Sequence, residues 1–202
     1  MSSRRATATL RLVAGALCLD FANSLDPRHG VVAEEYLDSY GALVDWAVHA
    51  GGLAPADGRR LVRLGRQRPA QGRHVLARAL SLRDALYTVF APASGARDRD
   101  DAVAVVGEEV QRAWLHTRLV RHDEGFAIEA VARNRLELPL WPVAHSALDL
   151  LRSPVRGRVR ECAGAGCGWL FVDTSKAARR RWCSMESCGN RAKVQRHRAL
   201  KG

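Results

Sequence analysis

Apolar residues recur three and four positions apart through most of the first 150 residues, the spacing of helices that bury one face. The clearest segment is 72–91, which reads GRHVLARALSLRDALYTVFA. Further helices are expected over 36–50, 54–67, 101–113 and 138–152, and a short apolar segment ends in a helix or turn near Asp20–Asp26. Glu34 and Glu35 fit the first turn of the 36–50 helix, where the helix dipole favours acids.

The helical pattern is interrupted twice. Residues 114–131 alternate loosely around Asp123-Glu124-Gly125, which predicts a β-hairpin. Ser153-Pro154 then marks a boundary, because the composition changes after it. The sequence therefore predicts an α+β protein with a polar, flexible segment at 1–9, a mostly helical domain with a minor strand pair at 10–152, and a small module at 153–202. The module is too short to build a core alone and needs a cross-link.

Positive charge is concentrated in that module. The whole chain carries a formal net charge of +11. Residues 152–202 hold thirteen lysines and arginines but only three acids, whereas the preceding 151 residues hold nineteen basic and eighteen acidic residues. A local surplus of this kind is the electrostatic footprint of a surface that binds a polyanion such as nucleic acid.

The predicted cross-link is a zinc ion bound by four cysteines. Cys162 and Cys167 are separated by four residues, and Cys183 and Cys188 repeat that spacing after a fifteen-residue interval. Two close pairs of thiols are typical of a tetrahedral structural zinc site, and we expect one Zn²⁺ here. Disulfides, an iron–sulfur or redox site, and substitution of one ligand by His197 remain open as alternatives.

The residues between and after the cysteines predict three small elements. Trp169–Val172 forms a strand that pairs with 158–162 as a hairpin. Asp173 or Thr174 caps a helix over 175–182, and a second helix covers 190–200. We expect Trp169 and Trp182 to pack around the metal rather than to stack on bases.

The two predicted helices carry the candidate nucleic-acid contacts. Basic and amide side chains on them can follow a phosphate backbone or reach base edges. The set is Lys176, Arg179, Arg180, Arg191, Gln195 and Arg198. Some arginines, Arg191 among them, can instead offset the negative charge of a zinc–thiolate cluster, about −2. A solvated charged face is the simpler interpretation, but no acids accompany these bases.

Several motifs together resemble a known family. CGNR at Cys188–Arg191, RRWCSM at Arg180–Met185 and FVDTS at Phe171–Ser175 are similar to the CGNR zinc finger, and LCLDFANSLD near the start resembles the opening of the ABATE domain. The resemblance covers nearly the whole chain. It implies a stress-induced transcription regulator in which the four cysteines named above bind the metal.

Enzymatic function is not expected. The chain lacks H-E-x-x-H, G-x-G-x-x-G, Walker and nucleophile-elbow motifs, and four thiolates leave zinc no vacant position for substrate. Cys18 fits as a small core residue. A third class of function is an N-terminal enzyme that is targeted by a C-terminal zinc finger, but no sequence motif supports it.

The expected function is that of a DNA-binding transcription regulator, with an RNA- or protein-interaction module as the alternative. The N-terminal domain would sense a small-molecule effector or form a homodimer. Four residues near apolar helices are candidates for an effector pocket, although capping and helix packing also explain them: Asp20, Asn23, Trp46 and Arg83. We expect a cytoplasmic protein without a membrane span, because Arg11 interrupts the first apolar run and no segment is long enough to cross a bilayer.

Overall fold

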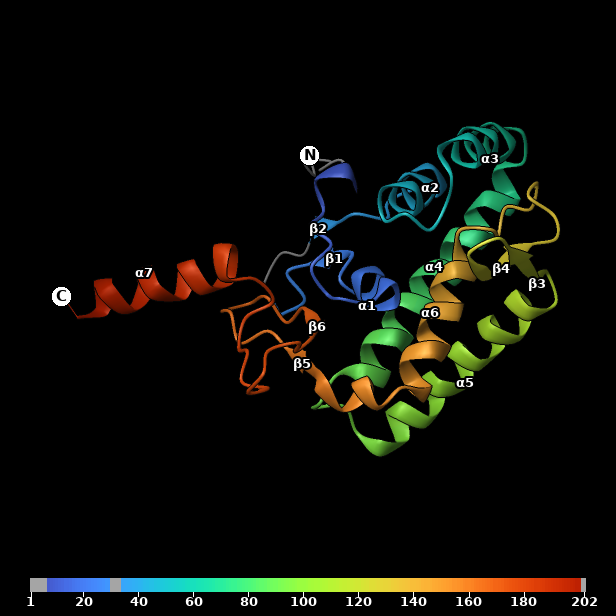
Figure 1. Ribbon diagram of the computed structural model, residues 1–202. Helices are drawn as coiled ribbons and strands as arrows, with labels where there is room; N and C mark the ends of the chain where they lie inside the picture. The colour runs from blue at the N-terminus through green and yellow to red at the C-terminus, as the bar shows by residue number, and fades with distance from the viewer. Residues whose placement is uncertain (1–6, 30–33, 201–202) are drawn as a thin grey trace.

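The computed structural model describes residues 7–29 and 34–200. Most of the segment predicted to be flexible, residues 1–6, lies outside that range, and Thr7–Thr9 form a short 3-10 turn (η1). Helices make up most of the chain (Figure 1). They are α1 (Leu17–Ala22), α2 (Tyr40–His49), α3 (Pro55–Gln67), α4 (Pro69–Phe90), α5 (Ala96–Trp114), α6 (Leu140–Arg152) and α7 (Asn190–Ala199).

The strands form three separate antiparallel pairs. These are β1 (Leu25–Asp26) with β2 (Glu34–Glu35), β3 (Thr117–His122) with β4 (Gly125–Ala130), and β5 (Val159–Glu161) with β6 (Leu170–Val172). A mostly helical N-terminal region followed by a small four-cysteine module confirms the predicted fold class. The hairpin at 114–131 and the strand pair of the module are also confirmed.

The prediction for Glu34 and Glu35 was wrong. They form strand β2 rather than the first turn of a helix. Helix α2 begins only at Tyr40, because the Ser39 hydroxyl accepts a hydrogen bond from the Ala42 amide and caps the helix there. Helix α5 also starts earlier than predicted, at Ala96, which shortens the connector from α4.

Helix α4 is the centre of the body. It packs against α1, α2, α3 and α5, while α6 packs against α5 and α1 (Figure 1). Aromatic side chains fill the contact between α1 and α2, where the Phe21 and Trp46 rings meet edge to face at 4.9 Å between centroids. Both side chains are fully buried.

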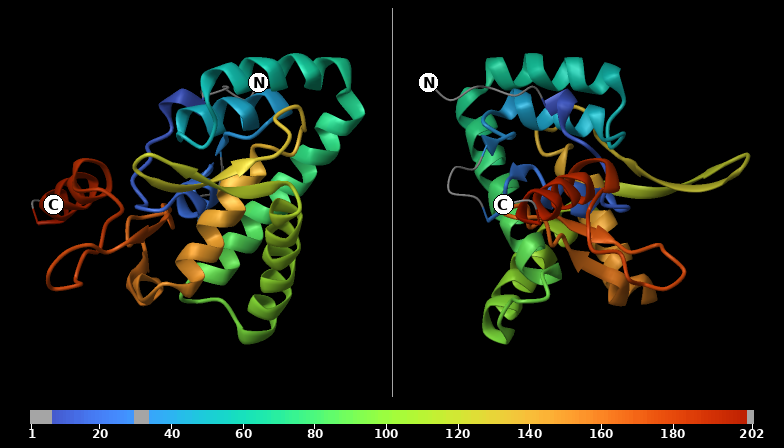
Figure 2. Two further views of the ribbon diagram at one scale, coloured as in Figure 1. Left: turned by 45° about the vertical axis from the view of Figure 1, so that its right-hand side comes forward. Right: turned by 90° about the vertical axis from the view of Figure 1, so that its left-hand side faces the viewer.

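The C-terminal module continues this core instead of forming its own. Leu170 and Phe171 of β6 are fully buried in the same apolar cluster as the helices. The Val172 amide also donates a hydrogen bond to the Ala14 carbonyl at 2.8 Å, which ties β6 to the segment before α1. Helix α7 is different, since it extends away from the rest of the molecule and buries none of its residues (Figure 1, Figure 2). The body therefore supports the module and leaves its last helix in solvent.

Candidate metal centre and nucleic-acid interface

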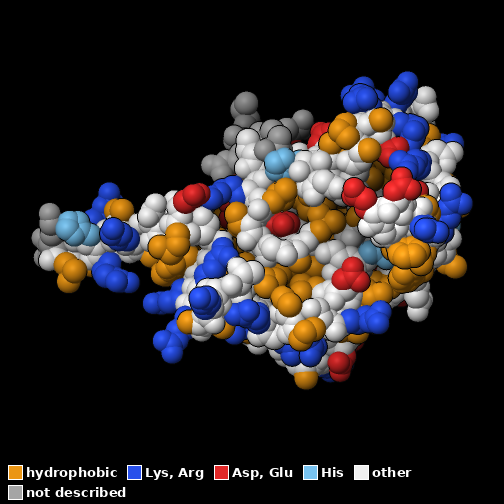
Figure 3. All heavy atoms as spheres, viewed as in Figure 1, with side chains coloured by type: hydrophobic (Ala, Val, Ile, Leu, Met, Phe, Trp, Pro, Cys, Tyr) orange, Lys and Arg blue, Asp and Glu red, His pale blue; other side chains and the backbone are white. Residues whose placement is uncertain are grey.

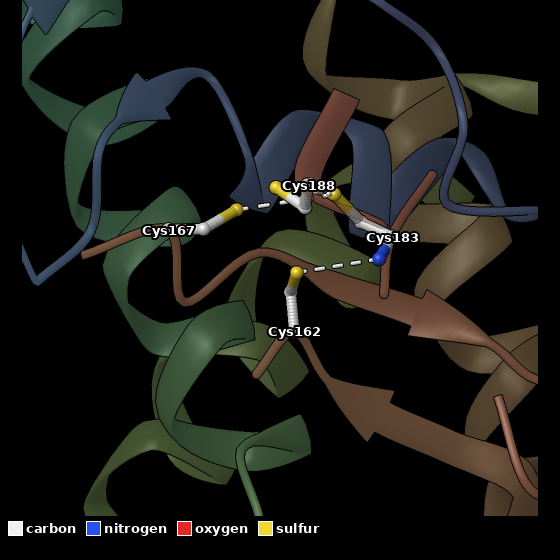
Figure 4. A group of neighbouring side chains, drawn as sticks. All are labelled: Cys162, Cys167, Cys183 and Cys188. Carbon is white, nitrogen blue, oxygen red and sulfur yellow. Dashed lines mark hydrogen bonds between the residues drawn. The ribbon is translucent and has the colours of Figure 1, made fainter. Parts of the chain in front are cut away.

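The four predicted cysteine ligands converge at one point (Figure 4). Cys162 follows β5, Cys167 lies in the turn before β6, Cys183 precedes a π-helical turn (η3, Met185–Gly189) and Cys188 lies within it. Their sulfur atoms all lie within 4.8 Å of one another, and all four residues are buried. Two pairs far apart in sequence thus form a single cluster.

The sulfur spacing fits a tetrahedral zinc site. A Zn–S bond of about 2.3 Å gives sulfur-to-sulfur edges of about 3.8 Å. The Sγ atoms of Cys167 and Cys183 are 3.8 Å apart, and those of Cys183 and Cys188 are 3.7 Å apart. A disulfide requires about 2.05 Å, and all these cysteines are free. The geometry agrees with one structural Zn²⁺ and not with the disulfide alternative.

Backbone groups around the cluster favour the thiolate form of Cys162. The Cys162 sulfur accepts hydrogen bonds from the amides of Gly164, at 3.4 Å, and Cys183, at 3.3 Å. Hydrogen bonds from the Cys167 and Cys183 thiols, and then these amides, lower the pKa of the Cys162 thiol. Gly164 lies close against the cluster, since a Cβ there would be 3.0 Å from the Cys188 sulfur, a tight contact.

Arg191 belongs to the metal centre. Its Nη2 donates a hydrogen bond to the Cys188 sulfur at 3.0 Å, and this bond is the main reason that the arginine pKa is raised. The guanidinium thus offsets part of the charge of the thiolate cluster. One candidate nucleic-acid contact is therefore already engaged by a ligand sulfur.

The N-terminal body holds the first cysteine pair from outside the module. The amides of Arg28 and His29 donate hydrogen bonds to the carbonyls of Cys167 and Gly166, at 2.9 and 3.0 Å. Gly168 has φ +65°, and a Cβ there would lie 2.5 Å from the His29 ring. Tyr87 of α4 donates its hydroxyl to the Gly168 carbonyl at 3.0 Å. The turn that presents Cys167 is therefore fixed between the module and the body.

The residues predicted to line an effector pocket make structural contacts instead. Asp20 accepts a hydrogen bond from the Ala14 amide, and Trp46 is fully buried against Phe21. Arg83 is buried, and its Nη1 donates to both carboxylate oxygens of Glu35 at 2.6 Å.

Asn23, the fourth predicted pocket residue, bonds to the backbone of β6. None of the four predicted residues lines the groove of about 1160 Å³ along α2 and α3. The contacts that the structure gives these four residues are packing, hydrogen bonds and an ion pair.

The helix predicted over 175–182 is absent. Asp173 accepts hydrogen bonds from the Ser175 amide and hydroxyl and from the Arg180 amide, which folds the chain into a loop. Ala178 adopts φ +49° within that loop, which no helix allows. Asp173 or Thr174 was expected to cap this helix, but Asp173 closes a turn instead. Lys176 and Arg179 are consequently exposed loop residues.

Arg180 is occupied within this loop. Its guanidinium donates hydrogen bonds to the carbonyls of Trp182, at 2.8 Å, and Cys183, and it lies over the Phe171 ring. Trp169 is buried and Trp182 is half-buried against the core, in agreement with the packing role expected for both. Because the Trp169 ring is buried, a nucleic-acid base cannot stack on it.

Helix α7 is the second predicted basic element, and it forms as expected. Arg191, Gln195 and Arg198 lie on one face, where they line a shallow hollow together with Val194. Lysine and arginine side chains run along α7 and over the adjacent loop (Figure 3). The sequence did not single out Lys193 and Arg196, which lie on the same helix and are exposed as well.

No helix among the described residues is both long and apolar enough to cross a membrane.

Comparison with known proteins agrees with the geometry. No curated protein matches the sequence. Residues 158–201 match the family model described as "CGNR zinc finger", and this segment contains all four clustered cysteines. Residues 15–154 match the ABATE model, described as "Putative stress-induced transcription regulator". The chain therefore belongs to the ABATE family and carries a C-terminal CGNR zinc finger.

Proposed function

We propose that this protein is a transcription regulator that binds duplex DNA through its zinc finger, with α7 as the principal contact. The observation that carries the proposal is the exposure of a helix whose charged residues are all basic. Helix α7 contains Arg191, Lys193, Arg196 and Arg198 and no acid, and none of its residues is buried. An α-helix with its side chains is about 10–12 Å in diameter, which fits the major groove, about 12 Å wide.

The charges of α7 are available to a partner. Among the described residues, Lys193, Arg196 and Arg198 have no ion-pair or hydrogen-bond partner for their side chains. Lys176 and Arg179 of the loop have none in that range either. Five exposed cations at one end of the molecule are the kind of surface that phosphates neutralise. Arg180 and Arg191 differ from these five residues, because their guanidinium groups bond to atoms of the finger itself.

The metal centre fixes the position of the first turn of α7. Cys188 and Arg191 join the first residues of the helix to the cluster, and the Arg11 guanidinium bonds Glu186 of η3 at 2.8 Å. Zinc held by the four thiolates would cross-link the two halves of the finger, which is a structural role. We place the boundary between body and finger at 152/153, where α6 ends.

Binding of a labelled mixed-sequence DNA duplex, followed by fluorescence anisotropy, tests the proposal. The combined variant Lys193→Ala, Arg196→Ala and Arg198→Ala should weaken binding at least about 100-fold at moderate salt, because three phosphate contacts are lost. Its zinc content should stay at that of the wild type, since none of these side chains touches the cluster.

A matched control removes the same number of exposed basic residues from the other end of the molecule. Arg59→Ala, Arg63→Ala and Arg66→Ala on α3 should leave DNA affinity within about threefold of the wild type. Equal loss in both variants would show that net charge alone drives binding. Full affinity in the α7 variant, or stronger binding of single-stranded RNA than of the duplex, would contradict the proposal.

A further inference from the structure

The exposed apolar side chains of this protein are concentrated in one place. Of the twelve large hydrophobic residues exposed in the described part of the chain, six lie between positions 114 and 131. This stretch contains the β3–β4 ribbon, whose turn end projects from the body (Figure 2, right), while its base lies against α6, where Thr117 and His145 are hydrogen-bonded at 3.2 Å. Apolar side chains also gather at this end in the space-filling view (Figure 3). Contiguous apolar surface of this kind marks an interaction site.

The register of the ribbon puts the apolar residues on a single face. Leu119 pairs with Ile128, and Arg121 pairs with Phe126, so these four side chains lie on the same side. Leu119, Ile128 and Phe126 are 66%, 40% and 72% exposed. An isolated pair of six-residue strands is only marginally stable in water. At the base of the ribbon, Ile128 and Ala130 line a cavity with Trp141 of the body. Toward the turn, Leu119 and Phe126 are left exposed, so the outer part of the apolar face lacks a third strand or covering layer.

The two edges of the ribbon differ. Strand β3 carries Arg118, Arg121 and His122, and charged residues on an edge discourage another strand from pairing with it. Strand β4 reads Gly-Phe-Ala-Ile-Glu-Ala and has one charged residue, Glu129. That carboxylate is paired with His122 of the same ribbon at 2.9 Å. The β4 edge is thus the one that is open to a further strand.

We propose that a second copy of this chain covers the ribbon, with the two β4 strands pairing antiparallel about a two-fold axis at Ala127. In this register Phe126 of each copy lies opposite Ile128 of the other, and both apolar faces point to the same side. The dimer has a four-stranded sheet, one face of which carries Leu119, Phe126 and Ile128 from both copies. Arg121 of each copy lies beside Phe126 on the outer strands of that face. The small side chain of Ala127 lets the strands approach at the axis.

The charge pattern of β4 favours its own copy as the partner. Glu129 of one copy lies opposite Gly125 of the other, whose cross-strand neighbour is His122. Each acid therefore approaches a histidine, and no like charges oppose each other. The inference stands on the ribbon alone and does not depend on DNA binding, although a dimer would present two copies of α7.

Sedimentation equilibrium of the full-length zinc-loaded protein at micromolar concentrations tests the dimer. The wild type should show the dimer mass, and Phe126→Asp should show the monomer mass because a charge enters the apolar face. Val194→Asp introduces the same charge at an exposed apolar position on α7 and should remain dimeric. Circular dichroism and zinc content should be the same for all three proteins, which separates loss of pairing from loss of folding.

A cysteine pair tests the register. Ala127→Cys lies on the proposed axis and should form an intermolecular disulfide under mild oxidation, whereas Arg118→Cys on β3 should not. A wild type that is monomeric throughout the concentration range would overturn the proposal. A dimer that survives Phe126→Asp, or that cross-links through Arg118→Cys and not through Ala127→Cys, would overturn it equally.

Discussion

The side chain of Asn23 bonds to both backbone polar groups of Leu170. Its Nδ2 donates to the Leu170 carbonyl at 2.8 Å, and its Oδ1 accepts from the Leu170 amide at 2.8 Å. The two residues are 147 positions apart, and both are buried. The side-chain amide of Asn23 thus makes the hydrogen bonds that a neighbouring strand would make at the edge of β6. Through this contact the helical body completes the hairpin that leads to the metal centre.

Replacement of Asn23 should therefore destabilise the whole protein. Asn23→Ala leaves the buried amide and carbonyl of Leu170 without partners, which costs about 3 kcal/mol of unfolding free energy. Urea denaturation should show a lower midpoint at an unchanged slope. Asn134→Ala, at an exposed position, should stay within about 0.5 kcal/mol of the wild type. Equal stability of Asn23→Ala and Asn134→Ala would show that the finger does not depend on this contact.

Arg191 should matter for metal affinity. Arg191→Ala removes the hydrogen bond to the Cys188 sulfur and a positive charge beside the thiolates, so zinc should bind about 10- to 100-fold more weakly. Competition with a chromophoric chelator measures the change. Arg196→Ala, which removes an arginine from the same helix without touching the cluster, serves as the control. Identical zinc affinities in the two variants would mean that Arg191 does not support the metal site.

Asp20 should make stability depend on pH. Burial raises the pKa of its carboxyl group to about 6, above the ordinary value of 3.8. The folded state therefore holds the proton more tightly than the unfolded chain, and stability is greatest at low pH and falls as pH rises through the folded pKa. Between pH 5 and pH 7 this group should cost the wild type about 1 kcal/mol.

The variant Asp20→Asn isolates that effect, because an amide oxygen can still accept from the Ala14 amide but cannot ionise. The unfolding free energy of the variant relative to the wild type should rise by about 1 kcal/mol from pH 5 to pH 7. A difference that stays constant across this interval would show that Asp20 does not titrate within it.

Local patterns in the sequence predicted most of the fold. Helical spacing located α2, α3, α4 and α6, and the alternation around Asp123-Glu124-Gly125 located the β3–β4 ribbon. Cysteine spacing predicted a cluster that the structure brings together. Each of these features depends on residues that are close in sequence or on a ligand chemistry with a fixed spacing.

Tertiary contacts explain where the predictions from sequence differ from the structure. The 175–182 segment has helical composition, but Asp173 bonds to the Arg180 amide and Arg158 bonds to the Ser175 carbonyl, so a loop forms instead. For Asn23 and Arg83, an effector pocket and a structural role both stayed open, because their partners, Leu170 and Glu35, lie far away in the sequence. No local signal identifies such pairs, and only the tertiary fold reveals them.

The salt dependence of DNA binding tests the central claim most directly. Five exposed cations of the finger make phosphate contacts in this account, namely Lys176, Arg179, Lys193, Arg196 and Arg198, so the logarithm of the binding constant should fall with the logarithm of salt concentration at a slope of about −4.5. Removal of the three α7 cations should reduce the slope to about −1.8. A slope near zero in the wild type, or the same slope in both proteins, would contradict DNA binding by this helix.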